Sequence, residues 1–433
     1  MTTSLVSYAH CATQSDSLGG TPVRFQDAIL WQVYPLGFCG APIREAATPA
    51  PRLRRLLNWL DHAVELGTSG LLLGPVFASS THGYDSLDQF AVDPRLGTEQ
   101  DLADLVEACH DRGLVVVLDG VFNHVGRDHP RFRQALLDGP DGPDADLFAV
   151  DWAAEGGPHA AVFEGHDALV ALNHSSAAAR EYVRSVMEYW LERGIDGWRL
   201  DAAYTVDPTF WAAVLPAVRE RHPDAWFVGE VIHGDYADFV RRSGVDTVTQ
   251  YELWSSVGNA IASRNFFELD WTLQRHNAFL ADFVPATFIG NHDVTRIAST
   301  VGEDRAVLAL AVLMTVGGIP TVYAGDEFGY TGVKEEREGG DDAVRPEFPD
   351  TPGDVAPWGA SVLQAHRQLI ALRRRYRWLV TATTTAEELT NTRYRYRVRA
   401  AGGSDELLVE LDIGDRPSGR ILAGDRVEWS TAG

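Results

Sequence analysis

Cysteine is scarce in this chain: only three of the 433 residues are cysteines, Cys11, Cys39 and Cys109. They are scattered and odd in number, so they match neither a disulfide framework nor the paired spacing of a zinc site. This pattern excludes a disulfide-stapled secreted scaffold and favours a reducing compartment. We therefore expect a cytoplasmic protein.

Basic residues and long apolar runs are also scarce. The chain has 37 lysines and arginines against 61 acidic residues, a formal net charge of −24. An acidic protein repels phosphate backbones, which argues against a nucleic-acid partner. No apolar run reaches the ~18 residues of a membrane-spanning helix. Residues 1–24 lack the basic and apolar stretches of a signal peptide, and we interpret them as a polar tail.

Short apolar runs alternate with helical patterns along the chain. Hydrophobic residues make up 45% of the sequence, enough for a large core. Runs that are apolar on both faces are typical of parallel strands covered by helices. The predicted strands are 28–34, 70–74, 114–119, 195–201, 226–230, 245–250, 286–290 and 319–324. Eight such units predict an α/β fold, a (β/α)8 barrel of about 250 residues or more.

The predicted helices and the remaining segments complete the domain organisation. Apolar residues recur at helical spacing in 53–67, 99–113, 178–194 and 364–376, and Gly67, Gly113 and Gly194 suit the ends of the first three. The unusually long gap between the third and fourth strands predicts an inserted lobe, 125–173. Strictly alternating residues predict a small antiparallel β domain, 378–433. The barrel then comprises 25–124 and 174–377.

Polar residues stand at or just beyond the ends of several predicted strands. They occur in the strings DGVFNH (119–124), GWRLD (197–201), GE (229–230) and FIGNHD (288–293). The strings supply three carboxylates and three neighbours: Asp201, Glu230 and Asp293, with His124, Arg199 and His292. Any one of them alone is more often a rim salt bridge or a structural histidine. All six at strand ends predict a barrel active site for glycoside hydrolysis, which needs paired carboxyl groups.

Spacing also suggests the roles of the acids. Asp201 and Glu230 end adjacent strands, about 4.8 Å apart in a parallel barrel, so their carboxyl groups are expected within about 5–5.5 Å, as in a retaining glycosidase. Arg199 lies two residues before Asp201, on the same strand face, and is expected to keep this nucleophile ionised. Glu230 follows the apolar run WFVG, which is expected to keep it protonated as the acid. Asp293 is expected to stabilise the oxocarbenium-like transition state.

Imidazole and aromatic side chains near the expected mouth are candidates for sugar contacts. His124 and His292 offer hydrogen-bond donors to hydroxyl groups. Tyr84, in the loop after the second strand, is the aromatic residue that we expect to contact substrate. Three others are equally compatible with core and cleft: Trp31, Tyr34 and Trp254. Trp198 is out of phase with Arg199 and is expected to pack against helices.

The four strings resemble the motifs of the α-amylase family, glycoside hydrolase family 13. The matching residues are Asp119, Asn123 and His124; Gly197, Arg199 and Asp201; Glu230; and Asn291, His292 and Asp293. The segments 82–85 and 317–329 also resemble family strings, and the resemblance spans about 29–328. It implies a (β/α)8 barrel with an insertion after the third strand and a C-terminal β domain. It also implies retaining cleavage or transfer at α-glucosidic bonds with the same three acidic roles.

Within that family, the strings GEVIH (229–233) and DDAVRP (341–346) look most like cyclomaltodextrinases and neopullulanases, which act on small maltosaccharides. The resemblance implies that Asp85, His233 and Arg345 bind substrate, with Asp85 and Arg345 beyond the cleaved bond. Those enzymes usually carry an N-terminal β domain, which we do not expect here, and commonly have tryptophan where Ile232 stands. A shorter branch that includes cyclic α-maltosyl-(1→6)-maltose hydrolase fits better.

The predicted function is retaining hydrolysis of α-1,4-glucosidic bonds in short or cyclic maltosaccharides. A transglycosylase or isomerase would use the same covalent intermediate. A non-catalytic amylase-like binding subunit is a remote third hypothesis, and it predicts a broken set of acids. The expected partners are a small oligosaccharide and a second copy of the chain in a homodimer, with neither nucleic acid nor membrane.

No metal or other cofactor is expected. By the resemblance, Asn123 matches a position that binds calcium in many secreted amylases, and further oxygen ligands would have to come from the lobe. Asp141, Asp144 and Asp146 lie in that lobe, but acids gathered in a loop are usually solvated. We therefore predict that calcium is not required.

Overall fold

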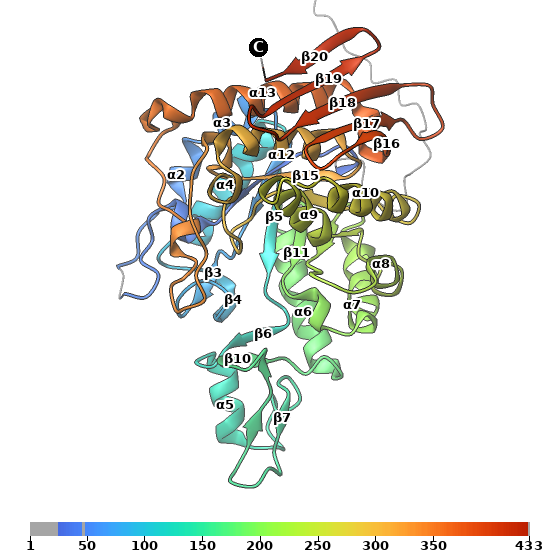
Figure 1. Cartoon of the computed structure of the whole chain (residues 1–433). Coiled ribbons are helices and arrows are strands. Elements are labelled where there is room, and N and C mark those ends of the chain that lie inside the picture. The colour runs from blue at the N-terminus through green and yellow to red at the C-terminus, as the bar shows by residue number, and fades with distance from the viewer. Residues whose placement is uncertain (1–24, 46–47, 432–433) are drawn as a thin grey trace, which may run out of the picture.

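Eight parallel strands form a barrel at the centre of the molecule (Figure 1). The computed structural model describes residues 25–45 and 48–431, so the predicted tail (1–24) and Cys11 lie outside the described residues. The strands are β1 (Leu30–Val33), β2 (Gly70–Leu73), β5 (Val115–Gly120), β11 (Gly197–Leu200), β12 (Trp226–Gly229), β13 (Thr247–Val248), β14 (Ala286–Phe288) and β15 (Ile319–Tyr323). Neighbours in sequence pair in space, β15 pairs with β1, and a bridge from Thr249 to Ala286 links the last two edges. The predicted (β/α)8 fold is confirmed.

Side chains of the strands alternate between two cores, as the two-residue period of a strand requires. The barrel interior contains Leu30, Leu72, Val117, Val228 and Ile319. The outer core, under the helices, contains Trp31, Leu71, Val116, Phe227 and Val322. Towards the carboxyl ends the inward positions become polar, with Gln32, Asp119 and Arg199 all buried. The apolar runs therefore build the barrel, and their last inward residues supply the site.

Helices surround the barrel (Figure 1). They are α1 (Pro35–Phe38), α2 (Arg54–Leu57), α3 (Leu60–Leu66), α4 (Glu99–Asp111), α6 (Ala177–Leu191), α7 (Pro208–Arg221), α8 (Tyr236–Ser243), α9 (Tyr251–Ala262), α10 (Phe267–Phe279), α11 (Ile297–Val301), α12 (Glu303–Thr315) and α13 (Ala360–Arg375). The glycines expected at three helix ends, Gly67, Gly113 and Gly194, all have positive φ angles. Short 3₁₀ turns follow several strands, among them Ala203–Thr205 directly after β11.

The predicted helix 53–67 is wrong in one respect, because it folds as two helices. The α-helical hydrogen-bond pattern is interrupted at Asn58 and Trp59, between α2 and α3, where the backbone N–H groups bond to carbonyls three residues back. The Trp59 ring is fully buried against Trp31, with 6.1 Å between ring centroids, and its Nε1 donates to the carbonyl of Pro349 at 3.1 Å. Burial of this large side chain therefore outweighs the helical pattern that runs through the segment.

Two additions to the barrel rise on the side of the strand ends. A hairpin of β3 (Phe77–Ser79) and β4 (Ser86–Val92), which the sequence pattern did not predict, carries Tyr84 in its loop. The inserted lobe contains α5 (Pro130–Asp138) and five short strands: β6 (His124–Gly126), β7 (Val150–Asp151), β8 (His159–Ala160), β9 (Val162–Phe163) and β10 (His166–Ala171). Figure 1 shows the lobe projecting from the barrel on the side opposite the C-terminal sheet.

The C-terminal part is a five-stranded antiparallel meander, as predicted. Its strands are β16 (Thr383–Leu389), β17 (Arg393–Arg399), β18 (Glu406–Asp412), β19 (Ser418–Ala423) and β20 (Arg426–Ser430). One face buries an alternating set of residues that includes Tyr396, Val398 and Val409. The strands lie within the predicted range 378–433; the exact domain limits stay predictions.

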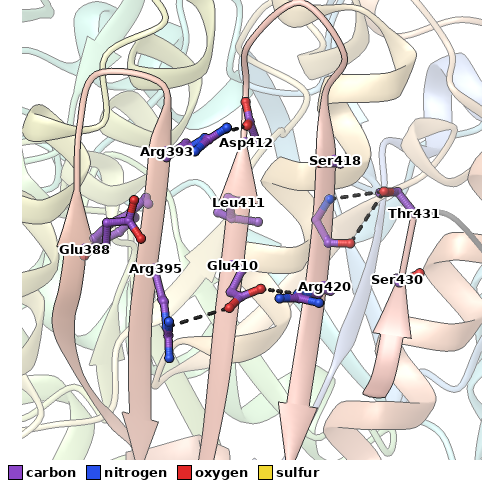
Figure 2. Close-up of a pocket in the computed structure, with 12 residues that line it drawn as sticks. Glu388, Arg393, Arg395, Glu410, Leu411, Asp412, Ser418, Arg420, Ser430 and Thr431 are labelled. Atoms are coloured by element: carbon purple, nitrogen blue, oxygen red, sulfur yellow. Dashed lines mark hydrogen bonds and ion pairs between the residues drawn. The ribbon is translucent and has the colours of Figure 1, made fainter. Parts of the chain in front are cut away.

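The other face of this sheet carries paired charges around a hollow of about 400 Å³ (Figure 2). Arg393 donates to Asp412 at 3.0 Å, and Glu410 pairs with both Arg395 and Arg420. Because these charges neutralise one another, they offer a ligand little net charge. The aromatic residue that borders the hollow, Tyr394, is 1% exposed and presents no face for stacking.

Within residues 25–45 and 48–431, no helix is both long and apolar enough to cross a bilayer.

Candidate active site

The predicted acids meet around one cavity at the carboxyl ends of the barrel strands. Asp201 directly follows β11, Glu230 directly follows β12, and Asp293 lies in the loop after β14. The cavity measures about 630 Å³, within the range of small-molecule sites. Six of the predicted site residues line it: Tyr84, His124, Asp201, Glu230, Asp293 and Arg345. Part of its wall comes from the lobe, through Phe163, Glu164 and Leu169.

Arg199 is buried behind the cavity and connects three carboxyl groups. Its Nη1 lies 2.7 Å from both oxygens of Asp119, its register partner on β5, and 3.4 Å from Oδ1 of Asp201. Its Nη2 lies 2.6 Å from Oε1 of Glu230. The sequence predicted that Arg199 serves Asp201. In the structure, Arg199 instead makes its short contacts with Asp119 and Glu230. These two acids, on the neighbouring strands, lie closer to its guanidinium group than Asp201 does.

Glu230 accepts hydrogen bonds from two further donors besides Arg199. The Tyr251 hydroxyl donates to Oε1 at 2.9 Å, and the backbone N–H of Ala202 donates to Oε2 at 2.9 Å. Ala202 directly follows Asp201 and has a left-handed backbone conformation, with a φ of 46°. Such a conformation is uncommon for a residue other than glycine and often marks a functional site. In this conformation the backbone N–H of Ala202, next to Asp201, points at the carboxyl group of Glu230.

The electrostatics at Asp201 differ from those expected from the sequence. Burial, followed by the charge of Glu230, raises the pKa of Asp201 well above its usual value. Burial also raises the pKa of Asp119, although Arg199 opposes the shift. Arg199 lowers the pKa of Asp201, as the sequence predicted, but burial and Glu230 outweigh this effect.

Asp293 is held ionised by cationic and imidazole neighbours. Arg345 Nη2 lies 2.6 Å from Oδ1, and His292 Nε2 lies 3.0 Å from Oδ2. Burial alone would raise the pKa of Asp293, but His292 and Arg345 outweigh burial and hold this pKa well below its usual value. The Arg345 guanidinium also stacks over the Tyr34 ring at 4.7 Å. Asp293 is thus the acid best placed to offer a fixed negative charge to the cavity.

Tyr84 and His124 line the cavity, and His292 supports Tyr84 from behind. The Tyr84 hydroxyl donates to Asp119 at 3.0 Å and contacts Nε2 of His292. His292 lies behind the cavity wall, and its Nδ1 contacts the amide of Gln32 at 3.1 Å. Burial lowers the pKa of His124 to about 4, so this ring is neutral near pH 7. His124 lines the cavity, and its Nε2 lies 3.1 Å from the carbonyl of Tyr84.

Besides Arg199 and His292, two more predicted substrate-binding residues, Asp85 and His233, lie outside the cavity lining. Both carboxylate oxygens of Asp85 accept hydrogen bonds from Thr81, at 3.0 and 2.7 Å, so this acid shapes the loop that carries Tyr84. His233 is exposed at the rim, with its ring 5.3 Å from that of Tyr204. Its neighbour Ile232 does line the cavity.

The structure places the four other aromatic residues that the sequence analysis considered near the mouth of the barrel. Trp254 lines the cavity. Trp31 is buried in the outer core, and Tyr34 lies beneath Arg345 with its hydroxyl donating to the carbonyl of His82. Trp198 is buried between Phe77 and Phe122, outside the barrel, as its phase predicted.

Comparison with known proteins agrees with this geometry. The family profile described as "Alpha amylase, catalytic domain" matches residues 32–353. The chain belongs to the α-amylase family. It is 32% identical over 340 residues to a cyclomaltodextrinase from a Bacillus species, covering 72% of this chain and 61% of that one. It is 30% identical over 383 residues to neopullulanase 2 from Thermoactinomyces vulgaris, covering 82% of this chain and 64% of that one. The chain thus spans somewhat under two thirds of these relatives.

A solved structure matches more of the length. Cyclic α-maltosyl-(1→6)-maltose hydrolase from Arthrobacter globiformis, in complex with cyclic α-maltosyl-(1→6)-maltose, superposes with a TM-score of 0.78. It is 27% identical, and the match covers 91% of this chain and 92% of that one. The family and the kinship with cyclomaltodextrinase-like members that the sequence indicated are therefore confirmed.

Sequence reasoning missed several cavity residues of this α-amylase family member. Tyr251, Tyr204, Phe163 and Glu164 all line the cavity. A signal for Tyr251 was present, because it directly follows the end of the predicted strand 245–250 in VTQYELW. Phe163 and Glu164 had no such signal, since they lie in the lobe, where strand ends do not mark a site.

Replacement of Tyr251 by phenylalanine is expected to lower kcat by about 10- to 100-fold, the range for loss of a hydrogen bond to a charged group. The Tyr251 hydroxyl donates to Glu230 and accepts from Asn291 Nδ2 at 3.0 Å. Because that bond orients the Glu230 carboxyl group, its loss should lower kcat more than it raises KM. The measurements are kcat and KM on maltotriose. Tyr396→Phe, which removes a buried hydroxyl bonded to Thr315 in the C-terminal sheet, is the control and should leave both values unchanged.

The calcium prediction has a direct test. Asn123 Nδ2 contacts His124 Nδ1 at 3.1 Å, Asp144 is paired with Arg131, and Asp141 and Asp146 are exposed. Within the described ranges, no group of three or more histidine, cysteine or acidic side chains is arranged to hold a metal ion. These residues do not fit a calcium site. Exhaustive chelation is expected to leave activity and the thermal midpoint unchanged, whereas a loss reversed by calcium alone would contradict the prediction.

Proposed function

We propose that this protein hydrolyses α-1,4-glucosidic bonds in short or cyclic maltosaccharides, with retention of configuration. The observation that carries the proposal is the convergence of Asp201, Glu230 and Asp293 on one cavity of about 630 Å³. Carboxyl groups from neighbouring strand ends suit a mechanism in which one attacks the sugar carbon directly and the other transfers a proton.

The first step forms a covalent intermediate. An Oδ atom of Asp201 attacks the anomeric carbon while Glu230 protonates the glycosidic oxygen, so the C–O bond to the leaving sugar breaks and a glycosyl ester of Asp201 forms. In the second step Glu230 takes a proton from water, whose oxygen attacks the same carbon and releases Asp201. This requires the proton on Glu230 at the start.

Asp293 and its partners stabilise the transition state in this scheme. Its carboxylate stays ionised next to Arg345 and His292 and opposes the positive charge that develops on the sugar ring. Because its two oxygens are already held, it needs no reorganisation during the reaction. Arg345 lines the cavity beside it and has guanidinium N–H groups to offer to hydroxyls.

The relatives' names support the substrate class. A cyclomaltodextrinase, a neopullulanase and a cyclic maltosyl-maltose hydrolase are among them. Transfer to a sugar hydroxyl instead of water uses the same intermediate and is the alternative. A non-catalytic subunit predicts a broken acid set, whereas all three acids line the cavity here. A cytoplasmic location and a homodimer stay predictions.

A product profile tests the proposal. The panel is linear maltosaccharides, cyclodextrins, cyclic maltosyl-maltose, pullulan, soluble starch and trehalose, with products followed by chromatography and the first anomer by NMR. Rapid opening of the rings to linear products, released first as the α-anomer, is the expected result. Products longer than the substrate would favour transfer, a first β-anomer would overturn retention, and no cleavage of any compound would overturn the proposal.

A further inference from the structure

A hydrogen bond joins the lobe to the barrel at the cavity. The hydroxyl of Tyr204 donates to Oε1 of Glu164 at 2.7 Å, and both residues line the cavity. Glu164 belongs to the lobe, between β9 and β10, whereas Tyr204 follows β11 in the barrel. We call this pair the lobe bridge. It connects two segments that lie 40 residues apart in sequence.

The lobe side of the bridge is built by a tight hairpin. Phe163 pairs with His166, which leaves Glu164 and Gly165 as the two loop residues. Their φ angles are 46° and 81°, the left-handed values that a type I′ turn requires at both positions. The Phe163 ring stacks on His124 with 4.8 Å between centroids. The hairpin tip is thus fixed against the cavity wall, and a non-glycine residue holds a strained conformation there.

The barrel side of the bridge is fixed relative to the acids. Tyr204 lies three residues after Asp201, and its backbone N–H donates to the carbonyl of Glu230 at 3.1 Å. The turn that carries it is further held by Thr205, whose hydroxyl donates to the carbonyl of Ala202 at 2.7 Å. The distance from the lobe bridge to the cleaved bond therefore cannot vary much.

We propose that Glu164 and Tyr204 are specificity-determining residues: the lobe bridge closes one end of the cavity and limits the length of glucan chain on that side of the cleaved bond. The proposal rests on the proposed function. A substrate that ends at the lobe bridge leaves it intact, whereas a longer linear chain has to break a hydrogen bond to a charged carboxylate before it can bind. A short or compact ring avoids that cost by ending within the cavity.

Three variants and two substrates test the proposal. Tyr204→Phe removes only the hydroxyl, Glu164→Ala removes the acceptor, and Glu155→Ala, an exposed acid elsewhere in the lobe, is the matched control. The substrates are maltoheptaose and an aryl maltoside. Both bridge variants should raise the ratio of kcat/KM on maltoheptaose to kcat/KM on the aryl maltoside by about tenfold and release longer products, since a hydrogen bond to a charged group no longer has to break.

Other outcomes would contradict either the role of the lobe bridge or the proposed function. A product-length profile that matches that of Glu155→Ala would overturn the proposal, because the bridge would then open freely. Equal losses on both substrates would also overturn it, since the pair would then bind sugar directly. Agreement between Tyr204→Phe and Glu164→Ala excludes local misfolding, because the two changes lie on different segments. If the wild type cleaves neither substrate, the proposed function itself fails, which is a separate result.

Discussion

Replacement of Asp201 by asparagine is expected to lower turnover by a factor on the order of 10⁴ or more, because it replaces the nucleophilic carboxylate with a neutral, weakly nucleophilic amide. Ground-state binding should persist, since Tyr84, His124 and Arg345 still line the cavity. The measurements are kcat on maltotriose and calorimetric binding of the same sugar. Near-normal turnover would remove the nucleophile assignment. Asp246→Asn is the control: this buried acid pairs with Arg219, and Phe227 N–H donates to it, away from the cavity. Its kcat should stay near that of the wild type.

The same substitution is expected to stabilise the fold. Burial and the charge of Glu230 raise the pKa of Asp201, so ionising it is harder in the folded protein than in the unfolded chain. Above the unfolded pKa the ionised form therefore costs stability, and this cost is present at neutral pH. A neutral asparagine removes it, and the free energy of unfolding should rise by about 1–2 kcal/mol. Thermal unfolding at pH 7 measures the change; a lower midpoint would contradict the idea that the ionised Asp201 destabilises the fold.

Replacement of Glu230 by glutamine is expected to lower kcat by about 10²- to 10⁴-fold on maltosaccharides, the range for loss of general acid–base catalysis. A sugar leaving group needs the proton, whereas an activated aryl group leaves without it. The first step on a dinitrophenyl maltoside should therefore be nearly unaffected, and single-turnover release of dinitrophenol measures it. An equal loss on both substrates would count against Glu230 as the acid.

Azide separates the two roles further. Azide needs no general base, so in Glu230→Ala it should resolve the intermediate on Asp201 and restore turnover with an α-glycosyl azide product. In Asp201→Ala it should attack the substrate directly and yield the β-anomer. Exchanged outcomes would mean that the two acids have exchanged roles. Both variants retain Asp293 and Arg345, so a loss of their transition-state stabilisation does not account for a difference between the azide products.

The barrel and the convergence of three acids at one end of it were readable in the amino-acid sequence. Eight apolar runs marked the strands, and the two-residue period placed Arg199 inside the barrel and Trp198 outside it. These features are local: each depends on a few neighbouring residues and on the burial of one strand. The motif order along the chain then brought the acids to one end of the barrel, because parallel strands end on the same side.

The partners of those acids depended on the tertiary structure. Arg199 bonds to Asp119 and Glu230 because barrel register sets them opposite its guanidinium, which the spacing to Asp201 did not reveal. Asp85 turned back onto Thr81, away from the cavity. Likewise, the hydrogen bond between Glu164 and Tyr204 joins two loops whose conformations have no repeating pattern. Strand periodicity is encoded residue by residue, whereas contacts between loops arise only when the folded barrel brings separate segments together.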